Sequence, residues 1–193
     1  MANKITYGIK NVYYAKATET LSTAGTWSVT YGAPKAMLGA RAISLTAQND
    51  TVDFSADNNP KYFTQNLFNG YEGDLTMAII GDDFRKDCLG EKQDTNGLVG
   101  QSINDKPNPF ALLFQFEGDE SETRHVLYRC IAGQTDVSSK TREETIDPNE
   151  EAISLNCGGA VDTGFVKWKC PKTVTTQYNS WFTTVYVPTV STT

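Results

Sequence analysis

The chain has 193 residues and a net charge of −6, from 17 Lys and Arg against 23 Asp and Glu. This balance argues against a dedicated nucleic-acid binder, because such proteins present a basic surface. Hydrophobic residues make up 39% of the chain and aromatic residues 11%, which excludes a disordered chain. The length predicts a single domain over residues 1–193. No apolar run reaches the ~18 residues of a membrane span, and residues 1–8 lack the apolar region of a secretory signal, so we expect synthesis in a cytoplasm.

Short runs of β-branched and aromatic residues predict a mainly β fold. In chain order, the candidate strands are residues 10–16, 26–31, 42–47, 71–80, 110–117, 123–131, 153–157 and 165–169. The run at 71–80 alternates, which places Leu75, Met77 and Ile79 on one face. The strand at 110–117 is apolar on both faces from Phe110 to Phe114. We therefore expect it to be a central strand that is covered on both sides.

Residues 48–66 are too polar for a core, and they predict an amphipathic hairpin. Its turn is expected at residues 58–60 (Asn-Asn-Pro), with residues 61–67 as the returning strand. Alternation gives this hairpin a hydroxylic and acidic face, made of Thr51, Asp53, Ser55 and Asp57. The residues expected to contact a neighbouring molecule are Val52, Phe54, Ala56, Tyr62 and Phe63. An isolated polar hairpin is barely stable in water, so we expect another surface, such as a second copy of the chain, to pair with it.

One short helix is predicted after the fourth candidate strand, and the sequence leaves a second one open at residues 178–184. Asp82 is a suitable N-cap, Phe84 and Cys88 stack at i and i+4, and Gly90 supplies the left-handed residue that ends the helix. A helix of about two turns needs tertiary packing to form. We therefore expect it to flank the β domain.

Three further segments are expected outside the core. Residues 135–151 are charged throughout and broken by Pro148. Residues 1–10 are expected to form an N-terminal arm, and residues 188–193 a loose C-terminal tail. The sequence does not say whether the N-terminal arm, residues 1–10, exchanges onto a neighbouring copy.

Catalytic and cofactor motifs are missing from the sequence. The single histidine, His125, has no nucleophile motif beside it and no second histidine for a zinc site. The four cysteines have no C-x-x-C spacing, and no phosphate-binding glycine loop occurs. We therefore expect no enzyme activity, no metal and no cofactor. A soluble β-rich chain of this kind is typical of a structural or assembly protein.

A series of segments resembles the major tail (tail tube) proteins of long, non-contractile-tailed bacteriophages. The segments are NGYEGDL (residues 69–75), DDFRKDCLGE (82–91), FALLFQFEGD (110–119), RHVLYRC (124–130), KTREETIDP (140–148) and WFTTVYVP (181–188). Their order and spacing cover the chain from about residue 11 to residue 188, and residues 162–177 fit the pattern least.

This resemblance implies a β-sandwich or barrel with one short flanking helix and extended hairpins that complete a barrel between subunits. It also implies rings, usually hexameric, that stack into a hollow tube in the virion tail after assembly in the host cytoplasm. The implied partners are further copies of the chain, a tape measure protein, the tail terminator and distal tail proteins, and DNA that passes without specific binding. No membrane is involved. Thr51, Asp53, Ser55 and Asp57 would then face the lumen.

The sequence also leaves a second interpretation open. Trp27, Trp168 and Trp181, together with abundant Thr and Asn, would suit a carbohydrate-binding β-sandwich module on a virion surface. Tryptophans more often anchor a core or an interface than a sugar platform. The tail tube interpretation is therefore the first hypothesis.

Overall fold

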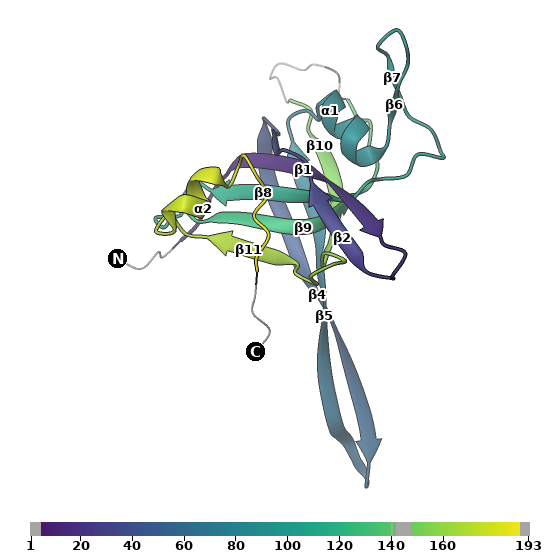
Figure 1. The fold of residues 1–193 in the computed structure, drawn as a ribbon, viewed down its shortest axis with the longest axis vertical. Helices are drawn as coiled ribbons and strands as arrows, with labels where there is room; N and C mark the ends of the chain where they lie inside the picture. The colour runs from purple at the N-terminus through teal and green to yellow at the C-terminus, as the bar shows by residue number, and fades with distance from the viewer. Residues whose placement is uncertain (1–4, 140, 142–147, 190–193) are drawn as a thin grey trace.

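The computed structural model describes residues 5–139, 141 and 148–189, and its fold is mainly β, as the sequence predicts (Figure 1). The elements are β1 (Ile9–Leu21), β2 (Trp27–Tyr31), β3 (Lys35–Ala36), β4 (Ala40–Ala56), β5 (Asn59–Met77), α1 (Asp82–Phe84), η1 (Arg85–Leu89), β6 (Lys92–Gln93), β7 (Val99–Gly100), β8 (Phe110–Phe116), β9 (Arg124–Ala132), β10 (Glu151–Gly158), β11 (Lys167–Cys170) and α2 (Thr175–Ser180). All eight candidate strands correspond to strands of the structure.

The main sheet is antiparallel and has the order β2-β1-β8-β9-β10-β5-β4. Strand β9 pairs with β8 along one edge, whereas its other edge is shared: Leu127 and the residues before it pair with β11, and Arg129 and the residues after it pair with β10. The short strand β3 pairs with β1. The fold is therefore a β-sandwich-like arrangement built around β8 and β9.

Strand β8 is the centre of the molecule. Phe110 and Leu112 lie in one hydrophobic cluster and Ala111 and Leu113 in another, and all four are fully buried. The first cluster is covered by the α1–η1 helix through Phe84, and the second by α2 and the chain after it. The prediction of a central strand covered on both sides is confirmed.

The predicted short helix exists, with one correction. Its N-cap is Gly81, whose carbonyl accepts the N–H of Phe84 at 3.0 Å, so Asp82 lies in the first turn and is not the cap. Gly90 ends the helix with φ of 82°, as predicted, and a Cβ there would meet the main chain of Lys106. The structure also has a second short helix, α2, which overlaps residues 178–184, where the sequence leaves a further helix open.

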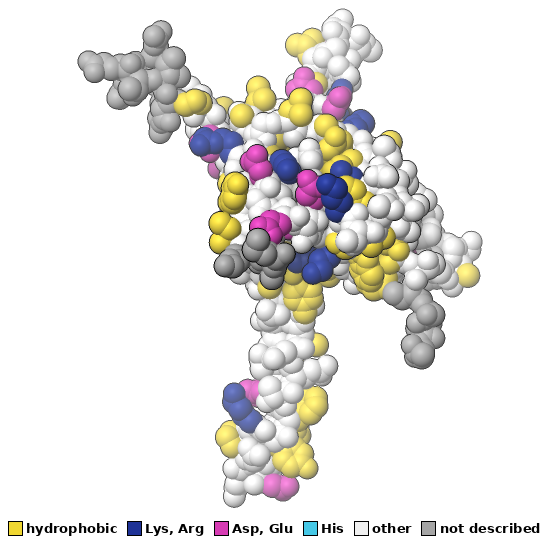
Figure 2. Space-filling model, turned by 90° about the vertical axis from the view of Figure 1, so that its left-hand side faces the viewer, with side chains coloured by type: hydrophobic (Ala, Val, Ile, Leu, Met, Phe, Trp, Pro, Cys, Tyr) yellow, Lys and Arg dark blue, Asp and Glu magenta, His cyan; other side chains and the backbone are white. Residues whose placement is uncertain are grey.

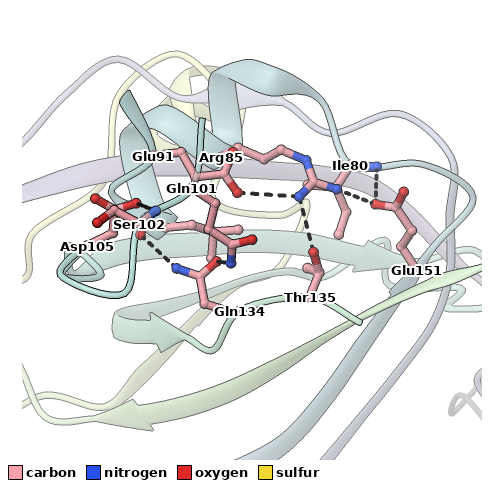
Figure 3. A network of polar contacts seen from close by, with 10 residues as sticks. Ile80, Arg85, Glu91, Gln101, Ser102, Asp105, Gln134, Thr135 and Glu151 are labelled. Atoms are coloured by element: carbon pink, nitrogen blue, oxygen red, sulfur yellow. Dashed lines mark hydrogen bonds and ion pairs between the residues drawn. The ribbon is translucent and has the colours of Figure 1, made fainter. Parts of the chain in front are cut away.

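Arg85 links this helix to the sheet through ion pairs and a hydrogen bond (Figure 3). Its guanidinium lies 2.9 Å from the Glu151 carboxylate at the start of β10 and 3.5 Å from Glu91, and it donates to the Thr135 hydroxyl at 3.1 Å. The same Glu151 oxygen accepts the backbone N–H of Ile80. Hydrogen bonds that involve a charged group are stronger than those between neutral groups. These contacts therefore fix the position of the helix relative to β10.

Of the three segments expected outside the core, two are partly packed against the body. Ile9 and Lys10, assigned to the N-terminal arm, already belong to β1, and the Tyr7 carbonyl accepts the N–H of Gly118 at 2.9 Å. Pro188, the first residue of the expected loose tail, is buried. Of residues 135–151, positions 140 and 142–147 lie outside the described residues, as do 1–4 and 190–193. No described helix has the length and apolar composition to cross a membrane.

Candidate assembly surface

The distal part of the β4–β5 hairpin, residues 48–70, projects from the body as a free-standing arm (Figure 1). Strand β10 pairs with β5 only as far as Tyr71, so beyond that residue β4 and β5 pair only with each other among the residues that the structure describes. From residue 46 to residue 69 every residue except Ala56 is exposed. The hairpin predicted for residues 48–66 is present, and it is longer than the sequence indicated.

The tip of the arm is a tight turn. Asp57 and Asn58 have φ of 53° and 59°, the two left-handed positions of a type I′ turn, which asparagine and aspartate tolerate best. The turn lies one residue earlier than predicted, because Asn59 and Pro60 already belong to β5. Asp57 therefore lies at the tip, beyond the end of β4, and is not part of the alternating face.

One face of the arm is polar, as the sequence predicts. Thr51 pairs with Asn66 and Asp53 with Thr64 across the two strands. The Thr51 hydroxyl donates to the Asn66 side-chain oxygen at 2.9 Å, and the Thr64 hydroxyl donates to the Asp53 carboxylate at 2.7 Å. These cross-strand bonds give the arm a row of hydrogen-bonded polar groups that face water.

The opposite face is apolar and uncovered. Phe54 lies directly opposite Phe63, and their side chains are 61% and 51% exposed. Val52 lies on the same face at 49% exposure, and so does Leu67, whose partner is Asp50. Exposed apolar side chains lie along this narrow projection (Figure 2). Patches of this kind are typical of interaction surfaces.

The predicted contact residues divide between the two faces. Val52, Phe54 and Phe63 share the apolar face, whereas Tyr62, the neighbour of Phe63 in β5, points to the polar face. Ala56, at the end of β4, is half-buried. Leu67 was not predicted as a contact residue, although alternation from Phe63 through Gln65 places it on the same face.

The charge of the arm is weakly negative. It contains Asp50, Asp53 and Asp57 against one cation, Lys61, whose Nζ lies 3.9 Å from the Asp53 carboxylate. Both side chains are well exposed, and an ion pair of this kind contributes little to stability. The arm therefore keeps a net negative charge.

The arm leaves the body at a glycine. Gly70 has φ of 113°, and a Cβ there would meet the carbonyl oxygen of Cys157 in β10. The pairing of β4 with β5 shifts by one residue at the same place, between Gln48 and Asn49. Such a bulge bends a strand and changes the direction of the residues beyond it. The sequence signal for this bend is the Asn-Gly pair at residues 69–70.

A second partly apolar surface lies beside the α1–η1 helix. A groove of about 490 Å³ there is bordered by Leu38 and Ile79, both strongly exposed. Tyr14 and Lys35 both bond the Asp87 carboxylate, at 3.0 and 2.6 Å. Burial alone would raise the Asp87 pKa, but these bonds outweigh it and lower the pKa. Asp87 does not border the groove itself, whereas its partners Tyr14 and Lys35 do.

Of the candidate catalytic and sugar-binding side chains, Trp181 is buried, His125 and Trp168 are half-buried, and Trp27 is exposed. His125 stacks on Phe114 at 5.2 Å, and burial lowers its pKa to about 4, so it is neutral near pH 7. Trp181 is 1% exposed and packs in the core, which removes it from any sugar-stacking platform. Within the described ranges, no three His, Cys, Asp or Glu side chains are placed to hold a metal ion.

Comparison of the sequence with protein-family models and with curated proteins finds no match.

Proposed function

We propose that this chain is a structural virion protein whose copies assemble through their arms into rings, hexameric by family resemblance, that stack into the tail tube of a long-tailed phage. The observation that carries the proposal is the arm itself: a long hairpin that is exposed on both faces and has no partner strand in the described part of its own protomer. A two-stranded ribbon with exposed aromatic side chains is stable only when another surface covers it.

A ring requires a heterologous contact, in which one surface of a protomer meets a different surface of the next. The arm and the β6–β7 hairpin project from opposite ends of the body, which suits such an arrangement (Figure 1). Strand β4 is the last strand of the main sheet, so its outer edge carries backbone groups open to a neighbour's strand. Pairing along this edge would close a barrel shared between copies.

The two faces of the arm then have separate roles. The apolar face, with Phe54 and Phe63, packs on a sister copy. The polar face, with Thr51, Asp53 and Ser55, lines the bore, and Asp57 adds a negative charge at the tip. A negative bore repels DNA phosphates, whereas Lys or Arg contacts repeated in every ring would hold the DNA and stop its passage.

The role is passive and needs no catalytic group, cofactor or metal. The partners are sister copies, a tape measure protein inside the tube, and the terminator and distal tail proteins at its ends. DNA crosses the lumen without specific binding. The location is the virion tail, after assembly in the host cytoplasm.

Removal of the arm tests this function. Replacement of residues 49–69 by an Asn-Gly turn joins Gln48 to Gly70, which face each other in the hairpin. We expect a folded protomer with an unchanged melting temperature that no longer sediments as polymer at concentrations where the full chain does. Polymer formation by the shortened chain at the same concentration would overturn the proposal.

A further inference from the structure

Two buried cysteines face each other across strands β9 and β10. Cys130 and Cys157 are directly opposite in the antiparallel register, and both are 0% exposed. Their Sγ atoms lie 2.6 Å apart, and both thiols are free. The sulfurs therefore point toward each other inside the core.

The backbone at this pair already has the spacing that a disulfide requires. Directly opposed residues of antiparallel strands have Cα atoms ~4.5 or ~5.5 Å apart, depending on the hydrogen-bonding pattern. Disulfides span Cα separations of ~4.4–6.8 Å. The register therefore places Cys130 and Cys157 within the range that a disulfide spans. Among the described contacts, none joins Cys88 or Cys170 to another sulfur.

We propose that Cys130 and Cys157 are a latent disulfide that hydrogen peroxide, a small oxidant able to enter the core during local opening, converts to a covalent bond between β9 and β10. One thiolate sulfur attacks a peroxide oxygen, the O–O bond breaks, and a sulfenic acid and water form once the released hydroxide takes up the thiol's proton. The second sulfur then displaces the hydroxyl group, and a second water leaves. Two thiols and one peroxide give one disulfide and two waters: the sulfurs are oxidised and the peroxide is reduced.

The bond would fix the root of the arm. On its other side, Cys157 is paired with Tyr71 of β5. Tyr71 is the residue of the body that adjoins Gly70, where the arm ends. A bridge between β9 and β10 at this position would hold β10 and the start of the arm against the central sheet. Cross-linking two residues separated by 27 positions also restricts the unfolded chain, which raises the melting temperature. This inference holds whether or not the arms assemble.

The test uses the full chain, reduced and then treated with hydrogen peroxide. The protein is denatured and labelled with N-ethylmaleimide, and its intact mass and its non-reduced peptides are measured. We expect two labelled thiols in place of four, one linked peptide pair containing Cys130 and Cys157, and a higher melting temperature that reductant reverses. Four labelled thiols, a different pairing, or sulfinic acid without a cross-link would each overturn the proposal.

Matched variants locate the bond. Cys130→Ala and Cys157→Ala are expected to abolish the cross-link and the rise in melting temperature, whereas Cys88→Ala and Cys170→Ala leave both in place. Persistence of the cross-link in Cys130→Ala would contradict the assignment. Where a core variant fails to fold, the peptide map of the unmodified chain decides the question alone.

Discussion

Substitution of Phe54 by serine on the apolar face of the arm should weaken assembly without weakening the protomer. Phe54 is 61% exposed, and a phenylalanine of roughly 150–250 Å² therefore leaves about 90–150 Å² open to a partner. At ~25 cal/mol per Å², burial of this area contributes about 2–4 kcal/mol to each contact. Since about 1.4 kcal/mol changes an equilibrium constant tenfold, the critical concentration for assembly should rise about 30- to 700-fold.

The critical concentration is measured by pelleting polymer over a dilution series, with the melting temperature as a check on the protomer. Tyr62→Ser is the matched control, because Tyr62 is equally exposed but lies on the polar face. We expect this control to assemble at nearly the original concentration. Assembly of Phe54→Ser at the unmodified concentration, or an equal loss in both variants, would refute the assignment of faces.

Three further predictions concern the bore, the helix and the core. Asp53→Lys combined with Asp57→Lys should leave tubes intact but slow DNA ejection in a manner relieved by salt, since added cations bind phosphates; unchanged ejection would show that the polar face does not line the bore. Gly90→Val should lower the melting temperature by roughly 5–15 °C, because left-handed strain and the clash with Lys106 together cost about 2–4 kcal/mol. Gly100→Val, where a Cβ would lie in open space, is the control. Equal melting temperatures of the two variants would contradict the reasoning. Burial lowers the His125 pKa to about 4, so the unfolded chain binds a proton first as pH falls below about 6.5. The stability that neutral His125 contributes is therefore lost between about pH 6.5 and 4. In urea titrations between pH 7 and 5, His125→Gln should reduce the dependence of unfolding free energy on pH, and an unchanged dependence would exclude His125 as its source.

The parts of the fold that sequence periodicity controls were predictable. Alternation in residues 51–57 and the two-faced apolar run from Phe110 to Phe114 identified the arm and the central strand, because a strand's side-chain period is fixed by its geometry. Gly90 was predictable for the same kind of local reason. Only glycine reaches its backbone conformation without strain.

Features that depend on tertiary contacts were not predictable. Asp82 has the composition of an N-cap, but the preceding Gly81 takes that place in an extended conformation, and the helix start shifts by one residue. Tyr62 was grouped with Phe63, although neighbours in a strand point to opposite faces. Which of the two shares the face of Phe54 depends on the pairing of β4 with β5, and the composition of the segment does not reveal that pairing. The opposition of Cys130 and Cys157 required the pairing of β9 with β10, which no local pattern encodes.

Electron microscopy of the full chain at high concentration tests the central claim most directly. We predict hollow rings or tubes in which residues 48–70 of each copy pair with a sister copy and Asp53 faces a central bore. Protein that stays monomeric under every assembly condition, or polymer whose arms point outward and away from the bore, would contradict it.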